Sequence, residues 1–466
     1  SMRAAGAAVR CAGRSWRRGG RDGAVAVQGP DGRRAASSPA PPYASRIDGF
    51  GGGTVWSEFS PMAAQCGAVN MGQGFPNFHT PDFVKRHGQA AIEENHNQYA
   101  RSQGHLPLVQ ALAEKYTAEL QRPRPINAET EVVVSMGATG VLFCLMQALV
   151  SPGDEVVVFE PQFDIYAAQA QMAGAKTVAV PLRLEGSGAG RRYTVDMEEF
   201  AAALSERTRL VLVNTPHNPT GMQFTAAQLR RMDEALAAFP RAVVVSDEVY
   251  EHQLFDGRPR VSPAAVSEDM WRRTVTVSSA GKAFSCTGWK VGWAVGPPEL
   301  VRAAWMAMQW ISFSVATPLQ QGVADALCEA ALPMRCPETG VEHPSYYAWL
   351  AQYFQRKRDR LVQVLEAAGL PCIVPDGGYF VMADSSRLDV PASYLAEPYL
   401  GSEEPVTRDW AVARWLTREV GVSPIPPSAF HCKANKPLAA NFLRFAFCKT
   451  DADIEECGAR LARHLG

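Results

Sequence analysis

The sequence predicts an α/β fold built on a mostly parallel, mixed sheet flanked by helices, with a small α+β domain after it. Three observations support this prediction. Short apolar runs, typical of buried strands, alternate with helical patterns from residue 131 onward, which is the rhythm of βαβ units. Polar side chains follow several of these strands, where open α/β sheets bind their ligands. The 466 residues are also enough for one large and one small domain.

The expected elements follow one another along the chain. An arm at 56–62 leads into a glycine-rich turn at 72–76, and the first helices are expected at 81–94 and 107–119. Then strands at 131–135, 155–160 and 176–180 alternate with helices at 139–150 and 163–173. Strands are also expected at 210–213, 243–247 and 274–277, and the apolar run that opens the second of these is typical of burial on both faces. After a loop-rich break at 333–344, a long helix at 346–368 precedes strands at 379–383 and 441–447.

This pattern divides the chain into four parts: a leader at 1–44, an N-terminal arm with part of the small domain at 45–75, a large domain at 76–332 and a small domain at 333–466. The leader carries eight arginines against two aspartates. An Arg-rich, acid-poor segment is typical of a mitochondrial transit peptide, so we expect the mitochondrial matrix. The alternative is a disordered basic tail on a cytoplasmic protein.

Bulk composition excludes several classes of function. Lysine and arginine total 46 against 47 aspartate and glutamate, so nothing favours nucleic acid or an anionic membrane surface as a partner. No apolar run approaches the length of a membrane-spanning helix. The ten cysteines are scattered without CxxC pairs or His/Cys clusters, so we expect neither a metal site nor a disulfide framework. No P-loop and no GxGxxG turn opening a helix is present.

The run at 278–290 contains the most informative lysine. Lys282 lies among small residues directly after the expected strand at 274–277. An amine that forms an imine needs partial desolvation, which lowers its pKa, and small neighbours that let a cofactor approach. The hydroxyl of Ser279 and the charge of Lys290 suit a phosphate group. Taken alone, the run is equally consistent with a surface lysine in a Ser/Gly loop.

Two other expected strands end in polar residues of complementary chemistry. Asp247 ends one of them, where a carboxylate can pair with a protonated pyridine nitrogen, and Tyr250 follows within reach of the same ring. The strand at 210–213 runs into Asn214 and Asn218, which offer amide donors on a proline-stiffened loop. Each residue singly could instead cap the next helix. Three strand ends with chemistry suited to one cofactor make coincidence a poor explanation.

These segments resemble the fold-type I pyridoxal-phosphate aminotransferases, and within them the kynurenine aminotransferase group (glutamine transaminase K, cysteine-conjugate β-lyase). The resemblance covers roughly residues 45–466. The residues that carry it are those at 69–76, 97–99, 214–219, 246–250, 279–290, 375–380, 425–430 and 442–445. It implies pyridoxal 5′-phosphate as the cofactor, no metal, and a homodimer as the functional unit.

The resemblance implies where the cofactor's phosphate binds. The implied phosphate residues are Gly137, Ala138, Thr139, Ser279 and Lys290, with Tyr99 donated to the partner subunit's site. Thr139 departs from the family pattern, which usually has an aromatic residue there, so the substrate pocket is expected to be wider. The segment 137–140 lies between a strand and a helix, where backbone N–H groups are available to an anion.

The resemblance also assigns the cofactor ring and the substrate. Phe163 is implied to stack on the ring, Asn218 and Tyr250 to donate to its phenolic oxygen, and Asp247 to keep its nitrogen protonated, with Asn214 close by. Arg444 lies in an alternating strand between phenylalanines, and a guanidinium buried there needs an anion. The implied substrate residues are Gly74, Trp56, Asn218, Phe313 and Arg444. Phe313-Ser314 departs from the family pattern and puts the substrate preference in doubt, but not the reaction.

The expected reaction is ping-pong transamination through a Lys282 aldimine, with aromatic or sulfur-containing amino acids such as kynurenine or glutamine as donors and 2-oxo acids as acceptors. Asp247 and Tyr250 complete the catalytic set. Alternatives are cysteine-S-conjugate β-lyase activity and another aromatic or methionine aminotransferase. A non-catalytic regulator that binds the cofactor is disfavoured, because the lysine and the arginine are both present and the leader shows no helix-turn-helix pattern.

Overall fold

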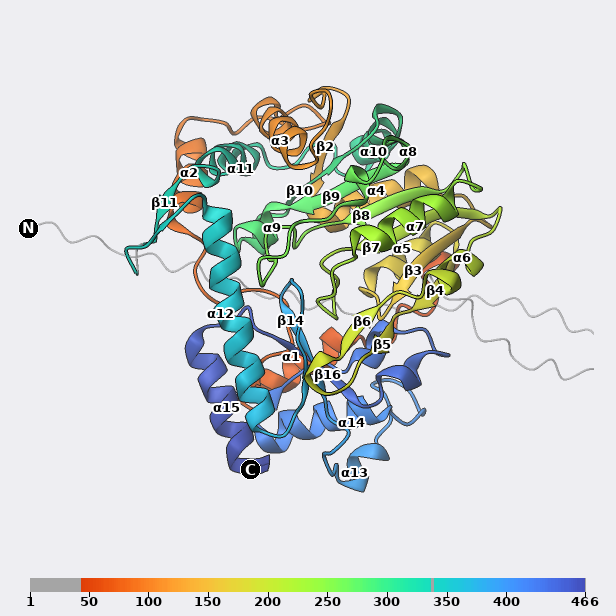
Figure 1. The fold of residues 1–466 in the computed structure, drawn as a ribbon, viewed down its shortest axis with the longest axis vertical. Helices are drawn as coiled ribbons and strands as arrows, with labels where there is room; N and C mark the ends of the chain where they lie inside the picture. The colour runs from red at the N-terminus through yellow and green to blue at the C-terminus, as the bar shows by residue number, and fades with distance from the viewer. Residues whose placement is uncertain (1–42, 337–338, 466) are drawn as a thin grey trace, which may run out of the picture. The chain divides into compact units, whose positions relative to one another are not determined.

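A seven-stranded sheet forms the centre of the larger part of the structure (Figure 1). The computed structural model describes residues 43–336 and 339–465. From edge to edge the sheet consists of β2 (Val132–Met136), β10 (Val291–Val295), β9 (Thr274–Ser279), β8 (Val243–Asp247), β7 (Thr208–Asn214), β3 (Glu155–Glu160) and β4 (Lys176–Pro181). Strand β10 runs antiparallel to β2 and β9, and the other neighbouring pairs are parallel. The predicted mostly parallel, mixed sheet is therefore confirmed.

Helices cover both faces of this sheet, and every residue of its central strands β3, β8 and β9 is buried. One face packs on α4 (Gly137–Leu149), α5 (Ile165–Met172) and α10 (Pro298–Ile311). The opposite face packs on α6 (Met197–Ala202), α7 (Ala226–Leu236) and α8 (Glu268–Arg272), and toward the β2 edge on α3 (Leu106–Glu119) and α11 (Thr317–Ala330).

The carboxyl-terminal part is an α+β unit beside that sheet. A three-stranded antiparallel sheet of β13 (Cys372–Ile373), β14 (Phe380–Asp384) and β16 (Phe442–Ala446) packs with α12 (Tyr346–Ala367), α14 (Arg408–Trp415) and α15 (Asp451–Leu465). The helix α1 (Val55–Gln65) also joins this part, and β1 (Val69–Asn70) pairs with β15 (Val422–Ser423). Figure 1 shows α12 running from the large sheet to this lower part, with α15 beside it.

Shorter elements complete the described chain. They are α2 (Asp82–Glu93), which packs on α11, the hairpin β5 (Arg183–Glu185) and β6 (Arg192–Thr194), α9 (Ala280–Ala283), the hairpin β11 (Met334–Arg335) and β12 (Glu342–His343), and α13 (Ala392–Leu395).

Most element starts lie within two residues of expectation, and two of the differences have a clear physical cause. The helix α4 begins at Gly137 rather than at residue 139, because Gly137 has φ of 69° and turns strand β2 directly into the helix. The expected arm at 56–62 lies inside helix α1, whose start is capped by the Thr54 side chain, which accepts a hydrogen bond from the Ser57 amide. A cap one residue before an apolar-periodic stretch is a signal that the sequence analysis did not use.

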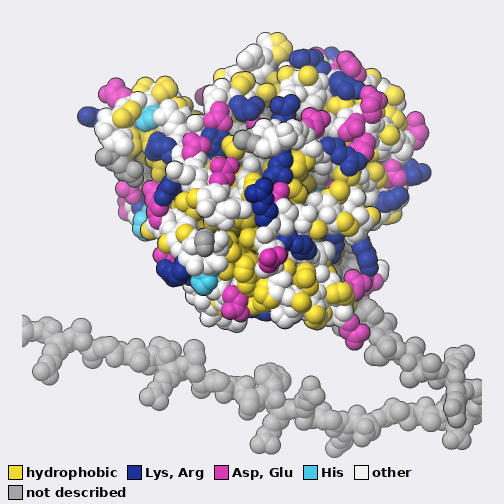
Figure 2. Space-filling model, turned by 60° about the horizontal axis from the view of Figure 1, so that its bottom comes forward, with side chains coloured by type: hydrophobic (Ala, Val, Ile, Leu, Met, Phe, Trp, Pro, Cys, Tyr) yellow, Lys and Arg dark blue, Asp and Glu magenta, His cyan; other side chains and the backbone are white. Residues whose placement is uncertain are grey.

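Residues 45–466 form one compact unit, so the division at 75/76 and 332/333 stays a prediction. The leader interpretation lies outside the described residues, apart from the last two positions of the segment. Within the described ranges, no helix is long and apolar enough to cross a membrane, and no group of three or more His, Cys, Asp or Glu side chains could hold a metal ion. On the face drawn in Figure 2, acidic and basic side chains are interspersed.

Candidate active site

A cavity of about 330 Å³ lies where the parallel strands end. Strand ends of the large sheet line one side, and α1, the turn after β1 and the carboxyl-terminal sheet line the other. The residues predicted from the sequence that line it are Trp56, Gly74, Ala138, Phe163, Asn214, Asn218, Asp247, Tyr250, Ser279, Lys282 and Arg444. The fold thus brings together side chains from both ends of the described chain.

Lys282 is positioned by the turn from β9 into α9. Its ammonium nitrogen donates to the Gly74 carbonyl at 2.7 Å. Its own carbonyl accepts from the Tyr379 hydroxyl at 2.8 Å and from the Gln253 amide at 3.0 Å. Burial lowers the pKa of Lys282 to about 8, and the nearby Arg444 adds to this shift. The amine is therefore held in place and is partly unprotonated near neutral pH.

Gly74 has to be a glycine at this place. A Cβ atom there would lie 2.3 Å from the Phe380 ring, far inside van der Waals contact. Without a side chain, the backbone carbonyl of Gly74 can approach Lys282 closely. Gly74 lines the cavity, as expected for a residue predicted to contact the substrate.

Asp247 is the last residue of β8, and its register partner on β7 is Asn214. One carboxylate oxygen, Oδ2, accepts from the Tyr166 hydroxyl at 2.6 Å. Burial raises the pKa of Asp247 to about 6, while the Tyr166 hydrogen bond opposes this shift. The Asn214 amide donates to the Asp247 carbonyl at 2.9 Å, which holds the two strand ends together. A buried carboxylate with a raised pKa suits a partner that carries a proton.

Asn218 and Tyr250 lie beside this carboxylate. The Asn218 backbone N–H donates to the Asn214 side chain at 2.7 Å, so the loop after β7 is fixed by the residue that ends the strand. Tyr250 is buried, and burial raises the pKa of its phenol above the usual range, so it remains a hydrogen-bond donor at neutral pH. Both side chains line the cavity as predicted.

Arg444 is 1% exposed and makes no ion pair with a carboxylate within the described ranges. Its Nη1 donates to the Asn218 side-chain oxygen at 3.0 Å and its Nη2 to the Gly72 carbonyl at 2.6 Å. Its Nε is buried and has no hydrogen-bond partner within these ranges. Burial lowers its pKa to about 10. A buried guanidinium whose charge is not matched by a carboxylate marks a place for an anionic ligand.

Aromatic rings surround the Arg444 guanidinium. Its central carbon lies 4.0 Å from the Phe380 ring centroid, 4.9 Å from that of Phe430 and 5.4 Å from that of Trp56. Such cation–π contacts stabilise the charge without neutralising it. The Trp56 indole is itself fixed, because its N–H donates to Asp164 at 2.8 Å. An anion that enters the cavity would find the guanidinium oriented in advance.

The other end of the cavity suits a phosphate. Ala138 and Ser279 line it, and the first backbone N–H groups of α4 lie beside them, where a helix leaves N–H groups without partners. The Lys290 ammonium would lie 3.3 Å from a Cβ placed on Gly137, so the lysine runs over this turn. Gly292, which the sequence analysis missed, allows the close approach, since a Cβ there would lie 2.3 Å from the Gly137 backbone.

Five predicted site residues do not line this cavity: Gly137 and Lys290, which lie at the turn just described, and Tyr99, Thr139 and Phe313. Tyr99 is 84% exposed and Phe313 55% exposed, and their ring centroids lie 5.2 Å apart at the surface. Phe313 therefore lies away from the pocket of its own chain. Thr139 lies in the first turn of α4, and its carbonyl accepts from the Gln169 amide at 3.1 Å. Of the residues of α4, Ala138 and Leu142 line the cavity instead.

The structure adds residues that sequence reasoning missed. Tyr166, Phe380 and Leu142 line the cavity, and Tyr379 fixes Lys282. Tyr166 lies in the first turn of α5, three residues after Phe163, and the centroids of the two rings are 5.7 Å apart. The Tyr379 contact joins residues almost a hundred positions apart, and no local pattern reveals it.

The donor set fits pyridoxal 5′-phosphate. Lys282 supplies a desolvated amine, Asp247 a buried carboxylate for a protonated ring nitrogen, and Phe163 an aromatic face. The cofactor's phosphate would bind at the end of the cavity beside Ala138 and Ser279. A substrate carboxylate would bind at Arg444, whose charge has no carboxylate partner in the described part of the chain.

Comparisons with known proteins point the same way. The family profile of aminotransferase class I and II matches residues 67–461. The kynurenine–oxoglutarate transaminase of Dictyostelium discoideum is 40% identical over 426 residues, which cover 88% of this chain and 94% of that protein. Among solved structures, Bna3p of Saccharomyces cerevisiae aligns with a TM-score of 0.79 and 34% identity, covering 88% of this chain and 95% of that one. YbdL of Escherichia coli, for which a methionine aminotransferase function was identified, aligns with a TM-score of 0.78 and 32% identity, covering 90% and 99%.

Proposed function

Because this chain belongs to the class I and II aminotransferases, we propose that it transfers the amino group of kynurenine to 2-oxoglutarate. It is an aminotransferase that uses pyridoxal phosphate, as this family does. The name of the relative from Dictyostelium supports the two substrates. The observation in this chain that carries the proposal is Arg444, a buried cation without a carboxylate partner in the described part, in the same cavity as Lys282.

Each residue of the cavity has a role in this reaction. When bound, pyridoxal phosphate supplies an electron sink for the bonds at the amino acid's Cα. Asp247 would hold the ring nitrogen, Phe163 the ring face, and Ser279 with Lys290 the phosphate. Lys282, whose pKa is lowered to about 8, can take a proton from the substrate Cα and return it, because its amine exists in both forms near neutral pH.

Arg444 serves both halves of the reaction. Kynurenine and 2-oxoglutarate share an α-carboxylate group, and a guanidinium can bind it through two parallel hydrogen bonds. The aromatic side chain of the donor would meet Trp56, Phe75 and Leu142, which give the cavity an apolar wall. This wall supports an aromatic donor over a charged one.

We propose that the working unit is a homodimer. Large apolar side chains are exposed on α10, in the Tyr99–Phe313 ring pair that follows it and at the end of β2: Trp310 (86%), Tyr99 (84%), Phe313 (55%), Met306 (52%) and Met136 (40%). Exposed apolar surface of this kind favours a protein partner. In such a dimer, Tyr99 and Phe313 would reach the partner's site rather than their own. Trp310→Glu should therefore give monomers in sedimentation experiments, whereas an unchanged dimer would place the interface elsewhere.

We also propose that the Arg-rich segment 1–44 directs the protein to the mitochondrial matrix, on the basis of its composition alone. A fluorescent fusion of the full chain should colocalise with a matrix marker, and the same fusion without residues 2–44 should not. A diffuse cytosolic signal from both fusions would leave the segment without this role.

The proposed reaction is tested with the purified protein, kynurenine and 2-oxoglutarate, by measuring glutamate formed. Methionine and a cysteine S-conjugate serve as competing donors, and pyruvate is measured in parallel. Glutamate produced faster from kynurenine than from methionine supports the proposal. Faster turnover of methionine makes the protein a methionine aminotransferase. Pyruvate as the main product from the conjugate shows β-lyase activity.

A further inference from the structure

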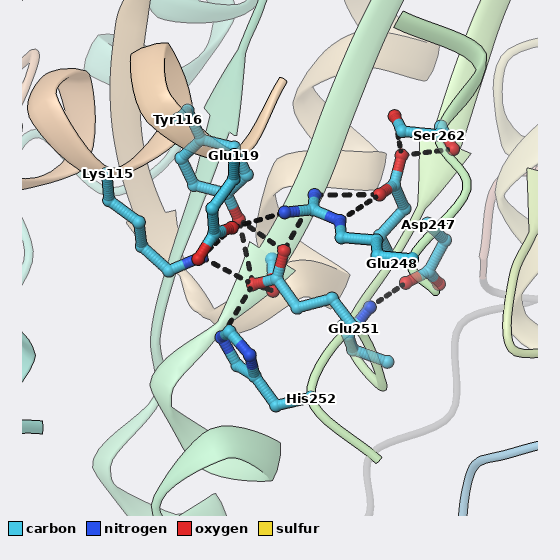
Figure 3. A network of polar contacts seen from close by, with 12 residues as sticks. Lys115, Tyr116, Glu119, Asp247, Glu248, Glu251, His252 and Ser262 are labelled. Carbon is cyan, nitrogen blue, oxygen red and sulfur yellow. Dashed lines mark hydrogen bonds and ion pairs between the residues drawn. The ribbon is translucent and has the colours of Figure 1, made fainter. Parts of the chain in front are cut away.

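A cluster of charged side chains is buried beside the ends of β8 and β9, outside the cavity (Figure 3). We call it the buried charge cluster. Its members are Lys115, Tyr116 and Glu119 of α3, Glu248, Glu251, His252, Arg260 and Ser262 from the loop after β8, and Ser278 of β9. None of these residues lines the cavity, so the reaction chemistry does not account for them.

Arg260 joins the carboxylates of this cluster. Its guanidinium donates to Glu248 Oε2 from Nε at 3.2 Å and from Nη2 at 2.8 Å. Its Nη2 also lies 2.8 Å from Glu251 Oε2, and its Nη1 donates to Glu119. Lys115 adds a second cation, 2.6 Å from Glu119 and 3.3 Å from Glu251. One side chain therefore links α3 to both glutamates of the loop.

Within the described residues, Arg260 is one of only two cations, with Lys115, that pair with the three carboxylates of the cluster. The side chains of Glu248 and Glu251 are 1% and 2% exposed. The ring of His252 lies flat against that of Tyr347, 3.8 Å away, and its Nε2 is 3.7 Å from Glu251, too far for a hydrogen bond. Burial holds the pKa of His252 well below its usual value, so it adds no charge. Without Arg260, three carboxylates would share Lys115 alone.

Two residues of the cavity, Asp247 and Ser279, lie next to residues fixed by the cluster. Asp247 directly precedes Glu248, whose Oε1 accepts from Ser246 at 2.8 Å and from Ser262 at 2.6 Å. The Ser278 hydroxyl donates to Glu251 at 3.0 Å, and the next residue is Ser279. The cluster therefore holds the strand positions adjacent to the ring-nitrogen partner and to the phosphate hydroxyl.

The lysine turn is attached less directly. Gln253 follows His252, and its side-chain amide donates to the Lys282 carbonyl at 3.0 Å. The cluster is therefore bonded directly to residues at the ends of β8 and β9, and it reaches the start of α9 only through the chain from Glu251 to Gln253.

We propose that Arg260 is a positioning residue of the cofactor site. By pairing with Glu248 and Glu251 it fixes the ends of β8 and β9, and with them the side chains of Asp247 and Ser279. The identity of the bound group rests on the proposed function. Loss of Arg260 should weaken cofactor binding through unbalanced negative charge, and not only through lost packing.

The test measures the dissociation constant of pyridoxal phosphate, from absorbance and tryptophan quenching, for the parent enzyme and Arg260→Met at pH 6 and pH 8. At pH 8 the variant should bind about 10- to 100-fold more weakly, the range seen when groups that hold binding residues are removed. At pH 6 the loss should be smaller, because a protonated Glu248 or Glu251 needs no cation. Arg258→Met is the control, since Arg258 pairs with Asp376 at 2.8 Å and does not contact the cluster.

A second pair of variants separates charge from packing. Glu251→Gln combined with Arg260→Met removes one charge of each sign and should restore most of the affinity. If the loss is equal at both pH values and the double variant does not restore binding, Arg260 contributes packing alone and the proposal is overturned.

Parental affinity in folded Arg260→Met also overturns it. If Arg260→Met does not fold, Ser278→Ala is the deciding variant, because it removes only the hydrogen bond from β9 to Glu251 and keeps every charge. Weaker cofactor binding by this variant supports the proposal, and parental binding overturns it. A parent that binds the cofactor but does not transaminate kynurenine refutes the proposed function and leaves this inference intact.

Discussion

Two arginines inside the protein, Arg444 and Arg260, differ in what surrounds their charge. Arg444 lies among aromatic rings and backbone carbonyls and has no carboxylate partner within residues 43–336 and 339–465, and burial lowers its pKa to about 10. Arg260 contacts the carboxylates of Glu119, Glu248 and Glu251, and they raise its pKa although burial opposes this. Arg444 is thus free to bind an anionic ligand, whereas Arg260 is already paired with carboxylates of the protein.

This difference separates binding from support. Burying a charge destabilises the protein unless an opposite charge lies beside it. A buried arginine without a carboxylate partner is therefore stabilised when an anionic ligand binds to it. A compensated cluster gains nothing from a ligand and instead fixes the elements that carry it. The two kinds of arginine should respond differently to substitution.

The largest effect is expected for the amine of Lys282. Lys282→Ala should abolish transamination, because one amine both anchors the cofactor and moves the proton at Cα. Absorbance of the bound cofactor and glutamate formation are the measurements, with the exposed Lys433→Ala as a control that should keep full activity. Turnover near the parental rate would remove Lys282 from the catalytic role.

Asp247→Ala should come next, with a loss of about 10²–10³-fold in kcat, because the ring nitrogen would lose its anionic partner. The protein should stay folded, since removing a buried carboxyl with a raised pKa takes away a group that burial disfavours in its charged form. Circular dichroism checks the fold and steady-state kinetics the rate. A loss below tenfold would contradict the assigned role.

Arg444→Met and Arg260→Met test the comparison directly. Arg444→Met should lower kcat/KM for every donor and acceptor alike, because it removes a charge-assisted pair worth about 1.5–3 kcal/mol of transition-state binding. It should change the free energy of unfolding of the apoprotein little. The second should cost about 3–5 kcal/mol of stability, since it leaves buried carboxylates unpaired. Urea unfolding and kinetics with three different donors give both numbers. Equal stability losses in the two variants would end the distinction.

The smallest effect concerns the hydrogen bond from Tyr166 to Asp247. In the apoprotein the pKa of Asp247 is raised to about 6 from a usual value of 3.8, so its contribution to stability is present below pH 3.8 and is lost as the pH rises through 6. Tyr166→Phe removes a group that lowers this pKa, so the loss should extend to higher pH.

The measurement is the melting temperature of the apoprotein at pH 5 and pH 7, where the variant should show the larger decrease. Adding Asp247→Asn should remove the difference between variant and parent. A difference that persists in this double variant would show that Tyr166 acts through another group.

Much of the site followed from local patterns. Asp247 and Lys282 could be found because each ends or follows an apolar run, and parallel strands place such ends at one edge of a sheet. Arg444 stood out because an alternating strand with aromatic neighbours gave its charge no local partner. Phe313 was assigned to the substrate pocket by resemblance, and the structure places it at the surface beside Tyr99. A sequence does not show which subunit a surface side chain serves.

By itself the sequence determined the sheet, its edge and the chemistry at the strand ends, because apolar periodicity and chain-local order decide them. Tertiary structure alone decided which distant groups meet: Tyr166 with Asp247, Tyr379 with the Lys282 carbonyl, and Arg260 with Glu119 and Glu251. The physical reason is that a buried charge or hydrogen bond is satisfied by whichever group the fold brings within about 3 Å. That distance depends on how helices and loops pack, and no spacing along the chain records it.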